Sequence, residues 1–485
     1  MDSINRIPDE ILKEIFIYVT DLDYDYIDIF QVRLVNKRFC KIATPLRVRH
    51  WSDYGYYSPI YTSPSRTTFN RFALELLRHP ELRLQVKSVQ IDWLRSDDGK
   101  ETPRHLIRPE NLALLARAAE ETLPDLASTT DLCDQIRQGS DDGITVLVLA
   151  WTTNLTSLDL TIPSDSRLKV GKDYLMLVLY FTKQLALRFV SDDPKSTLPL
   201  PMEKLHTSIF RYWNFDREIH VAHLSPFLHF PNLKSLNTLR IGDNRGRDFS
   251  YVAGFTENHY SMPFPERTSS LESIFLDDPT LSNAGFSSLL HACKNLKVFD
   301  LQFASALGTW SSTMLARALG EHASSLEEVS LSLQDDEDSQ WVPDSADTDE
   351  LPECYRELKR LKRAGIPMKH LLQREDENDS TTTKLNPGRL PESLEHLTIF
   401  HSDLRFVRVQ SESFPDMFKG VILDTFESDR KEALVGDWAR GRLEKLKTVD
   451  FSDALSDDPM VEEIRRVKDL AKERGVEFIL GKSIR

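Results

Sequence analysis

A short apolar pattern of the form L-x-x-L-x-L recurs along most of this chain, and it limits the available folds more than any other feature. The last two apolar positions of each copy are two residues apart, as in a short strand with one buried face. Two copies follow stretches of helical character, Gly285 to Ala292 and Thr313 to His322. The pattern therefore predicts an α/β fold, a solenoid in which parallel strands alternate with helices. The eight copies are Val86/Val89/Ile91, Leu155/Leu158/Leu160, Leu236/Leu239/Ile241, Leu271/Ile274/Leu276, Leu296/Phe299/Leu301, Leu326/Val329/Leu331, Leu394/Leu397/Ile399 and Leu446/Val449/Phe451.

The spacing of these copies is irregular. From Leu271 to Leu326 they are 25 and then 30 residues apart, but the other steps range from 35 to 81 residues. Leucine-rich repeats are 20–29 residues long and carry an Asn that is missing here. The region is therefore similar to leucine-rich repeats with degenerate, hidden or interrupted units, and we expect it to span residues 81–485.

The N-terminal stretch has a different period. Pro8 suits the first turn of a helix, and Asp9 and Glu10 follow at the positive end of its dipole. Apolar residues then recur with a helical period at Ile11, Leu12, Ile15, Phe16 and Val19. After an acidic spacer from Asp21 to Asp28, a second apolar set leads to Asn36, which is a suitable helix cap, and a third helix should end at Thr44-Pro45.

Three short helices in about 40 residues have too little interior to bury their apolar faces well alone, so such a module needs a partner surface. The alternative is an amphipathic pair of helices packed on the rest of the protein.

These residues resemble the F-box. Ile7 stands where Leu is usual and is followed by Pro8, Glu10, Ile11, Leu12, Ile15 and Phe16; in the second half Val32, Arg33, Leu34, Val35, Lys37, Arg38 and Phe39 match, with Phe39 replacing a common Trp. Together with the irregular repeats, the chain is similar to F-box proteins of filamentous fungi. The resemblance implies an F-box at 1–48 and a linker with first helices at 49–80. It also implies binding to a Skp-type adaptor of a cullin–RING ubiquitin ligase through Ile7, Pro8, Ile11, Leu12, Ile15, Phe16, Val32, Leu34, Val35 and Phe39.

Composition narrows the classes of partner. With 61 basic and 76 acidic residues the formal charge is −15, which argues against a general binder of nucleic acid or anionic membrane. The longest apolar run, Tyr174 to Phe181, is too short to span a bilayer. Six charged residues are spread through the first fourteen positions and leave no apolar core for a signal peptide, and the four cysteines show no framework spacing. We therefore expect a cytoplasmic or nuclear protein without membrane or nucleic-acid partners.

A region at 334–384 lacks the repeat signature, and we expect it to be an acidic insertion. Its flanks, Asp335 to Glu350 and Arg374 to Thr383, are polar and predict mobile loops. A basic cluster lies between them. It is either a nuclear-localisation or anion-binding patch or, as we favour, a surface helix whose charges the acidic loops balance. The cluster comprises Arg356, Lys359, Arg360, Lys362 and Arg363.

Motifs for enzymatic chemistry are missing from the sequence: there is no nucleophile elbow, Walker loop, dinucleotide glycine pattern or HExxH helix. We expect no catalytic residue, cofactor or metal. His220, His223 and His229 near Glu218 come nearest to a metal cluster but lack a closing ligand at a telling spacing. Trp151 and Trp213 are most simply core residues.

The residues between the apolar positions of each repeat strand should form the face on which solenoids usually bind. This face leans acidic, with seven acidic and four basic residues among its 24 positions. The best-spaced strands should present one client-binding surface, suited to a basic segment with an apolar anchor; its residues are Glu272, Phe275, Lys297, Asp300, Glu327 and Glu328.

The sequence therefore predicts the substrate-recognition subunit of a Skp–cullin–F-box ligase, which acts by proximity and not by catalysis. Two alternatives remain open: an adaptor-bound scaffold or regulator without a client to ubiquitinate, and an enzyme with an unrecognised site.

Overall fold

A computed structural model shows the chain as two compact units. The first comprises residues 1–238 and 245–263, and the second residues 239–244 and 264–485. The residues described are 6–22, 27–52, 68–91, 108–162, 176–191, 200–212, 218–243, 260–303, 311–333, 350–367, 370, 372–376, 379–385, 389–400, 443, 445–456, 469, 472 and 475–481.

The predicted α/β class is confirmed in both units, because parallel strands alternate with helices along the chain. In the first unit the strands are parallel and lie in the order β1-β2-β3-β4-β6. Their bounds are β1 (His50–Ser52), β2 (Ser88–Ile91), β3 (Ser157–Ile162), β4 (Thr207–Tyr212), β5 (Ile219–His220) and β6 (Ser235–Leu239).

The helices of the first unit follow its strands at irregular intervals. Between β2 and β3 the described residues 108–151 form four helices, of which α8 is buried along its whole length, as its sequence DDGITVLVLAW predicts. Trp151 at the end of α8 is a core residue, as expected; Trp213 lies outside the described residues. The bounds are α1 (Asp9–Leu22), α2 (Ile27–Val35), α3 (Lys37–Ala43), η2 (Thr44–Val48), α4 (Thr68–Arg78), η3 (Pro80–Gln85), α5 (Pro109–Thr122), α6 (Pro124–Thr129), α7 (Leu132–Gln138), α8 (Asp141–Trp151), α9 (Leu177–Val190), η6 (Val221–His223) and η7 (Ser225–His229).

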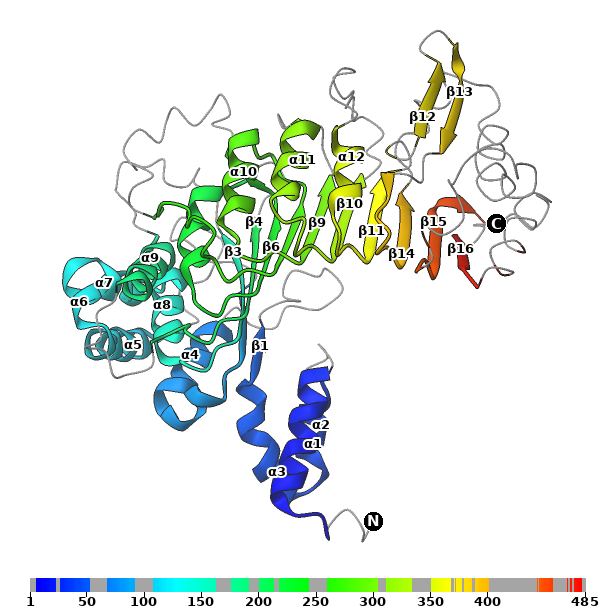
Figure 1. Ribbon diagram of the computed structural model, residues 1–485. Coiled ribbons are helices and arrows are strands. Elements are labelled where there is room, and N and C mark those ends of the chain that lie inside the picture. The colour runs from blue at the N-terminus through cyan, green and yellow to red at the C-terminus, as the bar shows by residue number, and fades with distance from the viewer. Residues whose placement is uncertain are drawn as a thin grey trace. The chain divides into compact units, whose positions relative to one another are not determined.

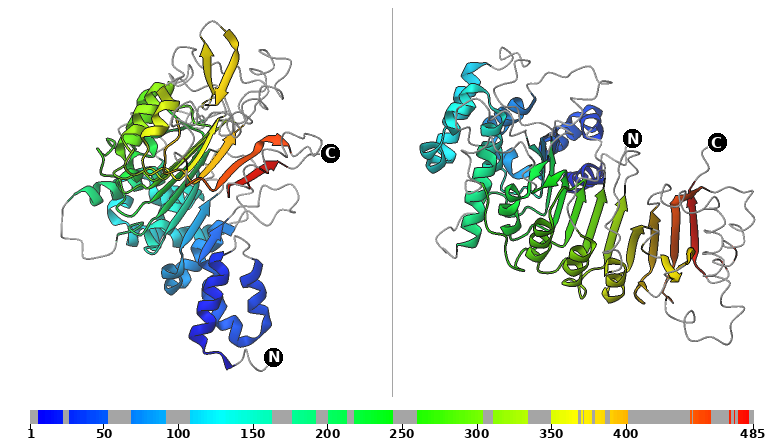
Figure 2. Two further views of the ribbon diagram at one scale, coloured as in Figure 1. Left: turned by 45° about the vertical axis from the view of Figure 1, so that its right-hand side comes forward. Right: turned by 90° about the horizontal axis from the view of Figure 1, so that it is seen from above.

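In the second unit the parallel order is β8-β9-β10-β11-β14-β15-β16, and helices α10, α11 and α12 line one face of its sheet (Figures 1 and 2). No helix in the described ranges has the length and apolar character needed to cross a bilayer. The bounds are β7 (Ile241–Gly242), β8 (Ser273–Asp277), α10 (Asn283–Ala292), β9 (Val298–Phe303), α11 (Ser312–Gly320), β10 (Glu328–Leu333), α12 (Glu350–Glu357), β11 (Arg363–Pro367), β12 (Leu372–Asp376), β13 (Asp379–Leu385), β14 (His396–Phe400), β15 (Thr448–Ser456) and β16 (Glu477–Gly481).

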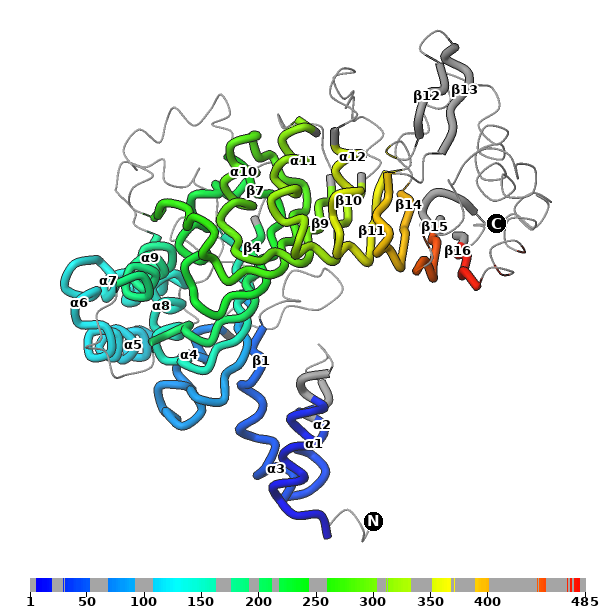
Figure 3. The backbone as a smooth tube through the Cα atoms, in the orientation of Figure 1, coloured from blue at the N-terminus to red at the C-terminus, as the bar shows by residue number. Residues whose placement is uncertain are grey.

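One hydrogen-bond arrangement recurs at the start of the strands. We call the residue immediately before a strand its lead residue. The carbonyl of Lys297, which leads β9, accepts the backbone N–H groups of Glu327 and Glu328 at 2.8 and 3.0 Å. The lead carbonyls of Arg49, Lys87, Thr156, His206, Glu272, Glu327, Lys362 and Glu395 accept two N–H groups from the following strand's start in the same way. Each strand therefore fixes the register of the next. Figure 3 traces the backbone through these successive strands.

This register corrects one predicted copy and reveals copies that the pattern missed. Leu236 of β6 pairs with Ser208 of β4, so the copy in β6 runs Leu233/Leu236/Thr238 and not Leu236/Leu239/Ile241. Strand β4 itself carries Leu205/Ser208/Phe210, and β11 carries Leu361/Ala364/Ile366. These copies escaped because a small or polar residue occupies the central core position.

The predicted insertion at 334–384 is wrong in part. Residues 350–367 contain α12 and β11, which pairs with β10 and β14 in the main sheet. Arg374 to Thr383 is not a loop, because β12 and β13 pair as an antiparallel hairpin. The other expected loop is Asp335 to Glu350. Its last residue, Glu350, begins α12, and residues 335–349 lie outside the described residues.

Helix α9 begins at a buried carboxylate from another helix. Asp142 of α8 accepts the backbone N–H groups of Leu177 and Val178 at 2.6 and 2.9 Å, and the hydroxyl of Tyr260 accepts that of Met176 at 3.0 Å. Side chains from other parts of the chain thus accept the free N–H groups at the start of α9, a role that a capping side chain next to the helix has in other helices. Burial raises the pKa of Asp142 to about 7, against the opposing effect of these two hydrogen bonds.

We expect Asp142→Asn to destabilise the protein by about 1 kcal/mol at pH 4, because an amide can replace only one of the two acceptor oxygens. The pKa of Asp142 is higher in the folded state than in the unfolded state, so protonation of this group stabilises the fold. This stabilisation is complete below about pH 4 and is lost as the pH rises to about 7. The advantage of wild type over the variant in urea unfolding should therefore fall from pH 4 to pH 7.5 and change sign, because each unit of pKa shift corresponds to about 1.4 kcal/mol. An advantage of wild type that grows with pH would contradict this assignment.

Candidate protein-interaction surfaces

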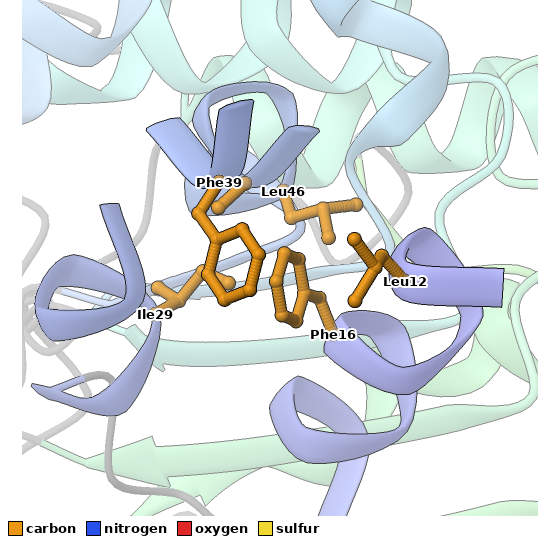
Figure 4. Close-up of a cluster of buried hydrophobic side chains, with 6 residues drawn as sticks. Leu12, Phe16, Ile29, Phe39 and Leu46 are labelled. Carbon is orange, nitrogen blue, oxygen red and sulfur yellow. The ribbon is translucent and has the colours of Figure 1, made fainter. Parts of the chain in front are cut away.

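The N-terminal module has an apolar core of its own (Figure 4). The rings of Phe16 in α1 and Phe39 in α3 meet edge-on, with centroids 5.2 Å apart, and Ile29 of α2 packs beside them. The buried set is Leu12, Phe16, Ile29, Phe39, Ala43 and Leu46. Helices α1, α2 and α3 are thus the three helices expected in this stretch.

Polar contacts fix the helix ends of the module. Asn36 caps α3, because its Oδ1 accepts the N–H of Phe39 at 2.8 Å, as the sequence predicts. Arg38 donates to Asp9 at 2.6 Å and to the carbonyl of Ile7. The start of α1 is thereby fastened to α3. The chain continues through η2, whose Arg47 pairs with Glu75 of α4, directly into β1.

The structure divides the residues predicted to bind an adaptor. Leu12, Phe16 and Phe39 are buried in the module itself, and Ile7 and Val32 are partly buried against that core. Pro8 is exposed at the start of α1. Four large apolar side chains are exposed: Ile11 by 51%, Ile15 by 43%, Leu34 by 85% and Val35 by 63%. Tyr18, one turn beyond Ile15, is also exposed and was missed, although it continues the same helical stripe.

The predicted client-binding residues lie on neighbouring strands of the second unit. In β8, Ile274 and Leu276 are buried against the helices, so the alternating residues Phe275 and Asp277 lie on the opposite, open face. Phe275 is in register with Asp300 of β9, which is in register with Ser330 of β10. Glu272, Lys297 and Glu327 form a row beside them, because each is a lead residue.

This row is an alternating ladder of charges: Glu272, Lys297, Glu327, Lys362, Glu395 and Lys447. Lys297 binds Glu272 at 2.6 Å, Lys362 binds Glu327 at 2.8 Å, and Lys447 binds Glu395 at 2.5 Å. The hydrogen bond from Lys362 lowers the pKa of Glu327, and that from Lys447 lowers the pKa of Glu395. The excess of acidic residues that the sequence predicts for this face is therefore neutralised along this row.

The basic cluster belongs to the same network. Arg360 also binds Glu327, at 3.1 Å, and Arg363 binds Glu328 at 3.2 Å. Within the described part of the chain, Arg360, Lys362 and Arg363 are thus balanced by β10 and its lead residue; the acidic segment 335–349 lies outside the described residues. Sequence reasoning missed this because it did not recognise β11, which places the cluster beside β10.

The three histidines do not converge on a metal site. His229 donates to the carbonyl of Pro263 at 2.9 Å, and the ring of His223 lies edge-on to Tyr260. Among the described residues, no group of three or more His, Cys, Asp and Glu side chains is arranged to hold a metal ion.

Comparison with models of known protein families finds no match, and no curated protein matches the chain.

The alternating ladder predicts that the stability lost by reversing one charge is not recovered when the charge of its partner is reversed as well. Glu327→Lys removes the bonds to Lys362 and Arg360 and adds a cation beside Lys297, so we expect a loss of roughly 0.5–1 kcal/mol at low salt. The double variant Glu327→Lys, Lys362→Glu restores that pair but sets like charges against Lys297 and Glu395, and should recover little of the loss. Urea unfolding at 20 mM and 1 M NaCl measures this.

At 1 M salt both losses should nearly vanish, because exposed charges are screened within about 3 Å. Full recovery in the double variant at low salt would show an isolated pair instead of a ladder.

Proposed function

We propose that this chain is the substrate-recognition subunit of a Skp–cullin–F-box ubiquitin ligase. The N-terminal module binds a Skp-type adaptor, and the repeat region, a solenoid resembling irregular leucine-rich repeats, binds a protein client. The observation that carries the proposal is the exposed apolar side chains of a module that already has a core. Ile11, Ile15 and Tyr18 follow one another at helical spacing on α1, and a contiguous exposed apolar surface is typical of a protein-binding site.

The division between buried and exposed residues assigns different roles within the F-box-like pattern. Leu12, Phe16 and Phe39 hold the module together. Ile11, Ile15, Leu34 and Val35 are available to a partner, and burying each against an adaptor would contribute about 1.5–3 kcal/mol.

The mechanism is proximity. A ligase core bound at the module and a client bound at the repeat region share one chain, so the client's effective concentration at the ubiquitin-charged enzyme rises. No residue of this chain takes part in the chemistry.

Binding of the purified full-length chain to a purified Skp-type adaptor tests the first half of this proposal. We expect Ile11→Asp and Leu34→Asp each to weaken binding at least about tenfold, because each places a charge in an apolar contact. Isothermal titration calorimetry measures the loss. Both positions are exposed, so the melting temperature should change little.

Leu114→Asp is the matched control, because Leu114 lies on α5 of the same unit and is exposed by the same 51% as Ile11. It should bind like wild type. Unchanged adaptor binding by a folded Ile11→Asp, Leu34→Asp double variant would refute the docking assignment.

Client accumulation separates a ligase receptor from a scaffold. Under proteasome inhibition, a wild-type receptor should co-purify with a ubiquitinated client. The Ile11→Asp, Leu34→Asp variant should co-purify with the same client in its unmodified form. Adaptor binding without any such protein would favour the scaffold.

A further inference from the structure

The open face of β8 and β9 carries two carboxylates that differ from those of the ladder. Asp277 ends β8, and Asp300 lies in the middle of β9, both partly exposed on the side away from the helices. The ladder glutamates each bind a lysine. Asp278 is buried and binds Arg240 at 2.9 Å.

The charges around Asp300 are predominantly negative. Burial raises its pKa, and the neighbouring carboxylates of Glu328 and Asp277 raise it further, while hydrogen bonds from Ser330 and Gln302 oppose the rise. One oxygen of Asp300, Oδ1, is buried without a hydrogen-bond partner. Burial and then Asp278 raise the pKa of Asp277, and Arg240 offsets this only in part. Within the described residues, neither Asp277 nor Asp300 forms an ion pair of its own, and the carboxylates around them add negative charge to this part of the face.

An aromatic ring adjoins these carboxylates. Phe275 lies two residues before Asp277 on the same face and in register with Asp300 on the adjacent strand. A cationic side chain that lies across the ring can thus direct its charged head toward both carboxylates. Contact with an aromatic face stabilises a cation, and a planar guanidinium can bridge two carboxylates where an ammonium acts as a point charge.

We propose that Phe275, Asp277 and Asp300 form a subsite for an arginine side chain of an extended client segment. This inference rests on the proposed function and identifies the chemistry of the client. The occupant is a peptide because the proposed function supplies a protein client, and the negative charge of the face repels nucleic acid. Glu272, Glu327 and Glu328, which the sequence predicts as client-binding, are then structural, because each is paired with a basic residue of the same chain.

A labelled peptide tests the subsite on the full-length protein. The probe is the acetylated, fluorescein-labelled pentapeptide Ala-Val-Arg-Val-Ala, and its matched control replaces arginine with uncharged, nearly isosteric citrulline. At 50 mM NaCl we expect the arginine peptide to bind at least tenfold more tightly than the citrulline peptide, as measured by fluorescence anisotropy. Equal binding of both peptides would overturn the proposal.

Three variants that each remove one negative charge locate the subsite. Asp277→Asn and Asp300→Asn should each weaken binding of the arginine peptide at least fivefold, whereas Glu327→Gln should change it less than twofold. Asparagine relieves the repulsion between the carboxylates, so Asp277→Asn and Asp300→Asn should keep at least the wild-type melting temperature. A similar effect from all three variants would show non-specific attraction and reject the subsite.

Adaptor binding distinguishes failure of this inference from failure of the proposed function. Asp300→Asn should retain the adaptor while losing the co-purified client. If Asp300→Asn retains both, the subsite is refuted while the ligase assignment stands. If the Ile11→Asp, Leu34→Asp variant retains the adaptor, the ligase assignment itself fails.

Discussion

A single lead carbonyl that accepts two N–H groups from the next strand underlies the repeated part of this protein. The same geometry occurs from Arg49 to His206 in the first unit and from Glu272 to Glu395 in the second. Because the carbonyl fixes both the start and the register of the following strand, side chains at equivalent positions form rows. The rows set which residues are neighbours: the core leucines on one face, Asp277 and Asp300 on the other, and the ladder along the starts of the strands.

The ladder shows how such rows manage charge. A strand with Glu before it is followed by one with Lys before it, across six lead residues, so each charge has opposite charges beside it. Individual exposed pairs stabilise little. Their alternation nevertheless decides which carboxylates of the sheet are neutralised within the chain, since each ladder glutamate has a lysine of a neighbouring strand beside it. Asp277 and Asp300 are distinguished by position and not by residue type.

The N-terminal module uses one apolar stripe for two purposes. Adjacent residues on a helix point about 100° apart, so Leu12 and Phe16 face the core while Ile11 and Ile15 remain exposed. A wide stripe on a short helix therefore both folds the module and leaves an apolar surface. Each substitution must be interpreted accordingly: a change at Leu12 tests folding, whereas a change at Ile11 tests docking.

The sequence by itself determined the α/β class, the three N-terminal helices, the Asn36 cap and eight of the twelve parallel strands described in the two units, because local periodicity and capping encode these features. Only the tertiary structure decided the register of β6 and the presence of β4 and β11, since Ser208 and Ala364 conceal the apolar pattern and only pairing with neighbours reveals it. The sequence identified Phe275 and Asp300 as neighbours on one face. It could not separate paired from unpaired carboxylates, because the lysine that neutralises Glu327 lies 35 residues away along the chain and meets it only through the register of adjacent strands.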